Sequence, residues 1–245
     1  MKLTSKQNSI IIGSLLGDGG IIETEYGHCV FRKGQAKRRK AYLDWTFDEM
    51  QPLSGSVTTH KNYCEGKEFP AARFNAKAHP IWDEFRKKWY QDGVKIIPED
   101  ITLDSLSISI WFFDDGCNQV KRRECSFATN GFTRDECELL CEKLLEHKIE
   151  AYTKNTVNVI LVKCSSYKNL VDMIKPYMLW KCFENKVRYR DTKHTSDEEA
   201  RMIFELKQSG LKQKEIALEV GKSFHVVSNI LRGKTKHLER LGLVA

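Results

Sequence analysis

Two aspartates, each followed directly by glycine, are the residues of this chain best placed to do chemistry. Asp18 follows the apolar residues 10–17 (IIIGSLLG), and Asp115 follows residues 108–114 (ISIWFFD), at an offset of 115 − 18 = 97 positions. Neither stretch has a clean polar face, so each is expected to form a buried helix. A carboxylate at the C-terminal end of a helix meets the negative end of the macrodipole and requires positive charge nearby.

If the two helices pack in parallel, their ends bring Asp18 and Asp115 side by side. Gly13 and Gly17 lie four residues apart on one helical face and allow a second backbone to approach closely. Two neighbouring carboxylates repel each other, and a hard divalent cation relieves that repulsion. The sequence therefore predicts a Mg²⁺ site that Mn²⁺ or Ca²⁺ would also occupy. The alternative, two solvated turn residues, is disfavoured because the motif occurs twice.

The remaining segments must position this pair, and they repeat one order of elements. In the first half we expect helices over residues 5–17, 39–51 and 80–90 and strands over 28–33, 57–64 and 69–77, the first of these paired with a short strand before the 23–27 turn. In the second half we expect helices over 103–114, 133–148 and 167–177 and strands over 117–121, 124–129, 151–154 and 158–164. The expected fold is α+β, with two αββαββα repeats over residues 1–98 and 99–190.

Composition narrows the choice of partner. The chain has 245 residues, 30% of them charged, and a formal net charge of +7, which favours a polyanion but also suits an ordinary basic protein. No apolar run approaches the ~18 residues of a membrane span, and the N-terminus does not resemble a signal peptide, so we expect a cytoplasmic protein without a membrane partner. The eight cysteines include no C-x-x-C pair, which favours reduced thiols over a disulfide framework or a zinc site.

Residues 191–196 are polar and are expected to be a linker, and residues 197–245 are of a different kind. The spacing of Ala217, Gly221 and Val227 is typical of the packing in a helix-turn-helix. The segment resembles the small DNA-binding modules appended to phage and intron-encoded endonucleases, which implies an all-α tail. On that resemblance His225, Ser228, Asn229 and Arg232 face the major groove, and Lys234 and Lys236 meet phosphates. The alternative is a helical hairpin that packs on the main domain.

Residues 1–190 resemble the LAGLIDADG homing endonucleases in their two-motif, single-chain form. IIGSLLGDG matches the family pattern closely, whereas SISIWFFDDG keeps the terminal Asp-Asp-Gly but has bulkier residues at the small-residue positions. The resemblance implies two saddle-shaped antiparallel sheets, with Asp18 and Asp115 at their base as catalytic metal ligands. It also implies that peptide carbonyls beside each aspartate, at Gly17 and Asp114, bind metal, and that a monomer cuts both strands of a long asymmetric DNA site.

The resemblance also indicates two catalytic lysines. Residues 94–98 (VKIIP) and 176–181 (PYMLWK) match segments that end each repeat in the family, and their lysines are Lys95 and Lys181. We expect both to stabilise the charge that develops on the scissile phosphate. Ordinary solvated lysines are the alternative, and Arg73 is a weaker candidate for the same role.

Alternate residues of the strands are expected to read base edges in the major groove. The candidates in the main domain are Arg32, Lys33, Thr59, Lys61, Arg73, Asn75, Gln119, Lys121, Arg122, Thr129, Thr153 and Asn155. A register slip of one residue would invert this choice. The charge run over residues 37–40 is assigned to phosphates or solvent.

Two other functions stay open at this point. A non-catalytic DNA-binding regulator would have the same fold and tail, but such proteins typically lack the acidic pair that Asp18 and Asp115 form here. An intron RNA maturase, with RNA as its partner, uses the same fold as well. Double-stranded DNA is the preferred partner.

Overall fold

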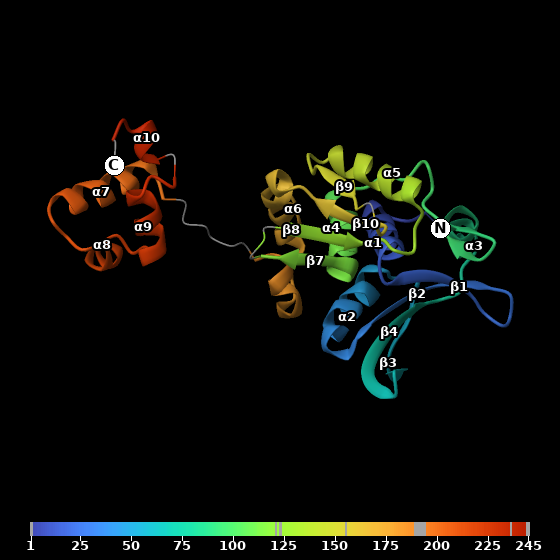
Figure 1. The fold of residues 1–245 in the computed structure, drawn as a ribbon. Helices are drawn as coiled ribbons and strands as arrows, with labels where there is room; N and C mark the ends of the chain where they lie inside the picture. The colour runs from blue at the N-terminus through green and yellow to red at the C-terminus, as the bar shows by residue number, and fades with distance from the viewer. Residues whose placement is uncertain are drawn as a thin grey trace. The chain divides into compact units, whose positions relative to one another are not determined.

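The chain folds as two compact units, Met1–Arg190 and Asp191–Ala245, each described here by itself (Figure 1). The computed structural model describes residues 2–120, 122, 124–154, 156–188, 195–235 and 237–243. Among these residues, none of the helices has the length and apolar character needed to cross a bilayer.

Two helices form the centre of the first unit: α1 (Ser5–Leu16) and α4 (Ser105–Asp115). A capping box begins each of them, at Thr4 and at Asp104. A Cβ added to Gly13 would lie 2.4 Å from the carbonyl oxygen of Ser107, and one added to Gly17 would lie 2.5 Å from the Cβ of Asp114. The contacts advance in the same direction along both helices, so the helices run parallel. The glycines of α1 therefore compensate for the bulkier residues of α4.

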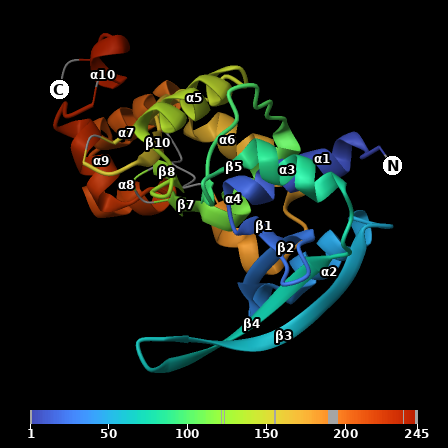
Figure 2. The ribbon, with the colours of Figure 1, turned by 90° about the vertical axis from the view of Figure 1, so that its right-hand side faces the viewer.

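The first repeat places a four-stranded antiparallel sheet beside this helix pair. Its strands are β1 (Gly19–Glu23), β2 (Cys29–Ala36), β3 (Ser54–Cys64) and β4 (Lys67–Ala76), in the spatial order β1-β2-β4-β3. Helices α2 (Lys40–Glu49), after the short η1 (Lys37–Arg39), and α3 (Ile81–Trp89) pack against the sheet. Figure 2 shows β3 and β4 as a long curved hairpin. The hairpin of β5 (Tyr90–Gln91) and β6 (Val94–Lys95) ends the repeat.

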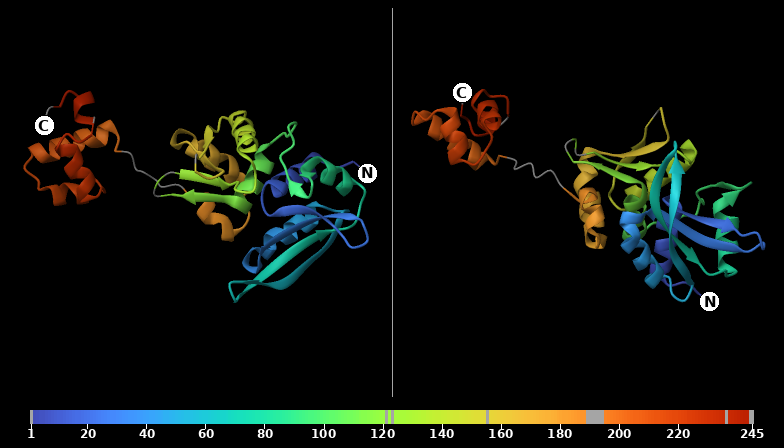
Figure 3. Two further views of the ribbon diagram at one scale, coloured as in Figure 1. Left: turned by 45° about the vertical axis from the view of Figure 1, so that its right-hand side comes forward. Right: turned by 90° about the horizontal axis from the view of Figure 1, so that it is seen from below.

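The second repeat has the same topology with shorter strands. Its strands are β7 (Gly116–Gln119), β8 (Glu124–Ala128), β9 (Ala151–Thr153) and β10 (Val159–Val162), in the order β7-β8-β10-β9. Helices α5 (Arg134–Leu145) and α6 (Tyr167–Ile174) follow the first and second strand pairs, with 3₁₀ turns η2 (Cys164–Ser166), η3 (Lys175–Tyr177) and η4 (Lys181–Lys186) around α6. Figure 3 shows the second sheet and the first as separate layers flanking the central helices. The predicted α+β fold with two antiparallel sheets is confirmed.

One apolar core runs through both repeats and buries the central helices. Ile10 of α1, Phe74 of β4, Trp111 of α4 and Phe127 of β8 are each fully buried in it. The predicted helix over 167–177 is shorter in the structure: α6 ends at Ile174 and the chain turns into η3, because Pro176 cannot donate the next helical hydrogen bond.

The second unit is all-α and has a core of its own. Its helices are α7 (Asp197–Gln208), α8 (Gln213–Glu219), α9 (Phe224–Leu231) and α10 (His237–Arg240). Ile203, Ile216 and Val227 are fully buried together. Gly221, between α8 and α9, has a φ of +60°, a conformation that glycine adopts without strain.

One predicted DNA contact in this unit is wrong. Ser228 is only 6% exposed because it lies on the core side of α9. His225 and Arg232 are exposed, Asn229 is half-buried, and Lys236 lies outside the described residues. Helix-turn-helix binding by this unit stays a prediction.

Candidate active site

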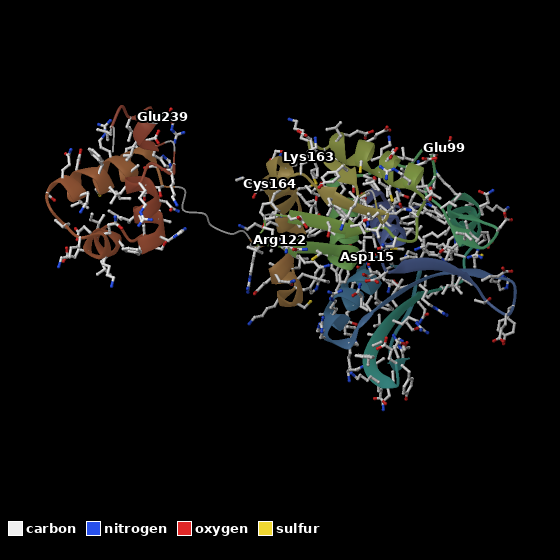
Figure 4. The ribbon with its side chains drawn as sticks, viewed as in Figure 1. Glu99, Asp115, Arg122, Lys163, Cys164 and Glu239 are labelled. Carbon is white, nitrogen blue, oxygen red and sulfur yellow. The ribbon has the colours of Figure 1, made fainter. Side chains whose placement is uncertain are left out.

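The two acidic residues that end the central helices form the base of the site. Asp18 follows α1 and is exposed, and Asp115 is the last residue of α4 and is half-buried. Figure 4 labels Asp115 at the point where α4 runs into β7. Burial, followed by the negative charges of Asp18 and Asp114, raises the pKa of the Asp115 carboxyl to about 7. The structure thus brings the two predicted metal ligands close enough for their charges to interact.

Gln35 of β2 joins carboxylates from the two repeats. Its Nε2 donates to Asp18 Oδ2 at 2.7 Å and to Asp114 Oδ1 at 2.9 Å. Its Oε1 accepts a hydrogen bond from Nη1 of Arg39 at 2.9 Å. The Nε of Arg39 is buried and has no hydrogen-bond partner among the described residues. Sequence reasoning missed Gln35 and gave Arg39 only a general phosphate role; the signal for Gln35 was its inward position on β2.

Lys33 and Asp114 form a buried ion pair between the repeats. The two atoms Lys33 Nζ and Asp114 Oδ2 lie 2.8 Å apart, and both side chains are fully buried. Lys33 Nζ also donates to the Ser14 and Tyr42 hydroxyls, at 2.9 and 2.8 Å. Burial raises the pKa of Asp114 to about 6, although Lys33 opposes that rise. The prediction that Lys33 contacts DNA is therefore wrong, because its side chain points into the core.

Two lysines bind the carbonyl groups at the ends of the central helices. Lys95 Nζ donates to the carbonyls of Leu15 at 2.9 Å and Gly19 at 2.7 Å. In the second repeat Lys186 Nζ donates to the carbonyls of Phe112 at 2.8 Å and Phe113 at 2.6 Å. Burial lowers the pKa of both ammonium groups, that of Lys186 to about 8.

The second of the two predicted lysines needs correction. Lys181 is exposed at the start of η4, and the charges that act on Asp115 come from Lys95 and Lys186 instead. The six-residue η4 turns the chain so that its last residue, Lys186, faces the helix end. Lys186 is thus the counterpart of Lys95, and the sequence match to a family segment pointed five residues too early.

The outer face of the first sheet continues the site. Arg32 pairs with Asn75 across β2 and β4, and Gly34 pairs with Arg73. An open cavity of about 520 Å³ is lined by Asp18, Asp114 and residues of this face. The residues of the sheet that line this cavity include Gly34, His60, Asn62, Ala71 and Arg73. Arg73 and its neighbours therefore face the same space as Asp18 and Asp114.

Thr59 and Lys61 were assigned to this face and belong to the other one. On β3 the partners of Arg73 and Ala71 are Thr58 and His60, so Thr59 and Lys61 alternate to the opposite side. Lys61 forms an exposed ion pair with Glu68 at 2.9 Å. The prediction failed by one residue of register, which the sequence did not fix.

The second sheet offers fewer of the predicted contacts. Gln119 and Arg122 are exposed, Arg122 at the far end of β7 from Asp115 (Figure 4). Thr129 and Thr153 are 1% and 6% exposed, so the prediction that they contact DNA is wrong. Thr129 instead donates to the carbonyl of Asn158 at 2.7 Å. Lys121 and Asn155 lie outside the described residues.

The donor set of the site fits a hard divalent cation. The side chains available are carboxylates, and the carbonyls of Gly17 and Asp114 lie beside them in the chain. Oxygen ligands of this kind are those that Mg²⁺ prefers. Among the described residues no group of three or more His, Cys, Asp or Glu side chains is arranged to hold a metal. Carbonyl oxygens, water or substrate phosphate would therefore have to complete the shell.

Two acidic helix ends below a pair of antiparallel sheets define a duplicated α+β protein built around one shared site. Residues 8–170 match the model of the LAGLIDADG DNA endonuclease family. The chain belongs to this family.

Two relatives and one solved structure are similar to the chain. It is 27% identical over 198 residues to the cytochrome b mRNA maturase bI2 of Debaryomyces hansenii, covering 72% of each chain. It is 28% identical over 142 residues to an uncharacterized protein of Methanocaldococcus jannaschii, covering 56% of this chain and 54% of that protein. The homing endonuclease I-WcaI, solved bound to its DNA recognition sequence, superposes with a TM-score of 0.68 at 19% identity, covering 78% of this chain and 89% of I-WcaI.

Proposed function

We propose that this protein is a homing endonuclease that makes a site-specific double-strand cut in a long asymmetric DNA target and depends on a divalent metal, with Mg²⁺ the natural ion. The observation that carries the proposal is that Asp18 and Asp115 lie close enough for their charges to interact at the ends of the two central helices, and that Asp18 lines an open cavity. The carboxylates are held together although burial, followed by repulsion from Asp18 and Asp114, raises the pKa of Asp115 to about 7. Such a costly arrangement is typical of a functional site.

Asp18 and Asp115, with the carbonyls of Gly17 and Asp114, would hold the metal. A divalent ion bound there supplies a water of lowered pKa and stabilises the leaving oxygen of a phosphodiester. Burial lowers the pKa of both Lys95 and Lys186, that of Lys186 to about 8, so Lys186 stays mostly positively charged at neutral pH. Their fixed charge stabilises negative charge that develops on the phosphate.

Gln35 and Arg39 orient the first half of the site. Gln35 holds the Asp18 carboxylate in one rotamer through its 2.7 Å hydrogen bond. The unpartnered Nε of Arg39 is a donor that a phosphate oxygen would satisfy, because a buried donor without a partner is costly. Arg39 therefore positions the scissile phosphate.

The cavity beside the acidic pair opens onto the outer face of the first sheet, which a duplex would cover. A β-ribbon fits the major groove and reads base edges through alternate side chains. The second unit extends the bound site, with His225, Asn229 and Arg232 on or near the surface of α9.

The test uses purified full-length protein, Mg²⁺ and DNA from the uninterrupted insertion locus. We expect discrete double-strand cuts that disappear in Asp18→Asn and Asp115→Asn while DNA binding remains. Lys163→Gln, which changes an exposed pair with Glu150, is the control and should cut normally. Specific binding without cutting in Mg²⁺, Mn²⁺ or any other divalent metal would reject the nuclease and favour a DNA-binding regulator.

The role of the second unit has its own test. A chain ending at Arg190 keeps the whole first unit, which has a continuous core without the tail. We expect weaker binding and a shorter protected footprint for the truncated chain. An unchanged footprint would show that the tail reads no DNA.

RNA splicing is a second candidate, because the maturase of Debaryomyces hansenii matches this chain over 198 residues. On this alternative the protein promotes splicing of the intron that encodes it. Splicing assays with the Asp18→Asn variant separate the two activities, since a maturase does not need the nuclease acid. If neither the parent protein nor the variant promotes splicing, this candidate is eliminated.

A further inference from the structure

The two sheets present very different side chains at equivalent positions. Gly20 lies two residues after Asp18, and Cys117 lies two residues after Asp115. From Gly20 the cross-strand row of the first sheet continues through Arg32, Asn75 and Ser56. From Cys117 the corresponding row of the second sheet continues through Ser126, Leu161 and Tyr152. Each row begins two residues along the chain from the aspartate that follows or ends a central helix.

The first row and its neighbour carry two arginines. Arg32 Nε donates to Asn75 Oδ1 at 2.9 Å, which fixes the guanidinium and leaves its two terminal amino groups free of described partners. In the next row Arg73 stands opposite Gly34, and its Nη2 lies 3.5 Å from His60 Nε2. An added Cβ at Gly34 would touch nothing within 4 Å, so the sheet surface is open between the two arginines.

Within the described part of the chain, the two guanidinium groups have no acidic partner in an ion pair. Among the described residues neither Arg32 nor Arg73 forms an ion pair, and burial together with the charge of Arg73 lowers the pKa of Arg32. Two neighbouring, partly exposed cations with donors free of described partners can bind the acceptors of a ligand. Guanine presents two acceptors, N7 and O6, in the major groove, and their spacing matches the arginine fork.

The second sheet has no such donors. The sequences of β7, β8, β9 and β10 are GCNQ, ECSFA, AYT and VILV, with no lysine or arginine among them. In the equivalent row Leu161 is partly exposed and Tyr152 is 49% exposed. Apolar side chains of this kind contact thymine methyl groups and tolerate several bases. The strands are also shorter: β9 has 3 residues, whereas β3 has 11.

We propose that base discrimination is concentrated in the half-site that covers the first sheet, where Arg32 and Arg73 each bind one guanine, and that the half-site over β7–β10 is read loosely through apolar contacts. This inference rests on the proposed function only in requiring that the chain binds duplex DNA. It concerns the two halves of the target and not the cutting reaction.

The test is selection of bound duplexes from a random DNA pool by the full-length protein in Ca²⁺, followed by competition binding with every single-base variant of the selected site. We expect one half-site with two strongly preferred guanines, where substitution weakens binding about 10- to 100-fold. Substitutions over the other half should change binding only a few-fold. The selected duplex is then incubated with Mg²⁺ to check cutting.

Arg32→Lys and Arg73→Lys keep the charge and remove the fork. Each should lose the guanine preference at one position of the same half-site while the salt dependence of binding is unchanged. Arg134→Lys, on the surface of α5 and paired with Glu138, is the matched control and should alter no preference. Equal stringency in both halves, or a uniform loss of affinity for all sequences in the two variants, would overturn the inference and assign the arginines to phosphates. Enrichment of no sequence at all would instead contradict the proposed DNA binding itself.

Discussion

The Lys33–Asp114 pair gives the most demanding test of the physical reasoning about the site. Both side chains are fully buried and their charged atoms lie 2.8 Å apart. Lys33→Met keeps an unbranched side chain of similar length and removes the charge. The variant leaves Asp114 buried with the hydrogen bond from Gln35 and with Lys186 as the remaining cation that acts on its carboxyl group.

The expected loss of stability depends on pH. Breaking a buried pair by removing one partner costs about 3 to 5 kcal/mol when the remaining group stays ionised. The pKa of Asp114 is already about 6 with Lys33 present, and without that cation it rises further. At pH 8 we therefore expect a loss in the range just given. At pH 5 the carboxyl is protonated, and the loss falls to the about 1 to 3 kcal/mol of an incompletely bonded neutral group.

The sign follows from proton binding. A carboxyl whose pKa is higher in the folded than in the unfolded chain binds more protons when folded, so stability decreases as pH rises between the two pKa values. Lys33→Met should steepen this decrease above pH 5. A second substitution, Asp114→Asn in the same chain, removes the buried charge, so it should recover most of the loss at pH 8 and abolish the added pH dependence.

The assay is urea unfolding at pH 5 and pH 8, followed by tryptophan fluorescence. All five tryptophans, Trp45, Trp82, Trp89, Trp111 and Trp180, lie in the first unit, so the signal reports that unit alone. Lys163→Met, which breaks an exposed pair, is the control and should change stability by less than about 1 kcal/mol. A loss for Lys33→Met that is equal at both pH values, or no larger than that of the control, would refute the reasoning.

Three further predictions test other parts of the structure. Gly13→Val should destabilise the first unit by about 1 to 3 kcal/mol in the same unfolding assay. The reason is that even a Cβ at this position would lie 2.4 Å from a backbone oxygen of α4. A variant as stable as the parent would contradict the close contact between the two helices. Lys186→Met should reduce the rate of DNA cleavage at least about tenfold, whereas Lys181→Met should leave that rate nearly unchanged. The reason is that Lys186, and not Lys181, donates hydrogen bonds to carbonyls at the end of α4. A larger loss for Lys181→Met than for Lys186→Met would support the sequence-based prediction that Lys181 is the catalytic lysine. Asp115→Asn should stabilise the metal-free protein by about 1 to 2 kcal/mol at pH 8, a value reduced from about 1.36 kcal/mol per pKa unit because the side chain is partly exposed. The gain should decrease as pH falls from 7 to 4 and vanish below the unfolded pKa of 3.8, where the parent carboxyl is protonated in both states.

The elements of the fold were predictable because local signals and the global fold agree. The capping box at Thr133 and Glu136 marks the start of α5, and the Asp-Gly motifs mark the ends of α1 and α4. The equal order of elements in both halves then predicts equal sheets, and both sheets have the order edge, centre, centre, edge with the first and third strands of the chain outermost. Hydrophobic periodicity and helix caps involve residues that are neighbours in the chain, so both can be recognised in a single sequence.

The direction in which strand residues point was not predictable in the same way. Lys33 and Arg32 are adjacent on β2, both basic, and only one of them can face the solvent side of the sheet. The core position goes to Lys33 because Asp114, 81 residues away in the chain (114 − 33), supplies a buried carboxylate at that point. Such a pairing depends on tertiary contact between the repeats, which neither hydrophobic pattern nor charge run reveals.

The two lysines at the ends of the central helices show how far the internal duplication extends. The carbonyls bound by Lys95 and Lys186 come from Leu15 and Phe112, which differ by 112 − 15 = 97 positions, the offset of the two aspartates. The lysines themselves differ by 186 − 95 = 91 positions and lie on a strand in one repeat and a 3₁₀ turn in the other. What the repeats share at this point is an ammonium group at the carbonyl end of a helix, where the macrodipole favours positive charge. The helix end and the acidic residue beside it require this positive charge, but the segment that carries the lysine differs between the two repeats. A lysine of this kind is therefore identified from its position in the structure and not from its position in a sequence motif.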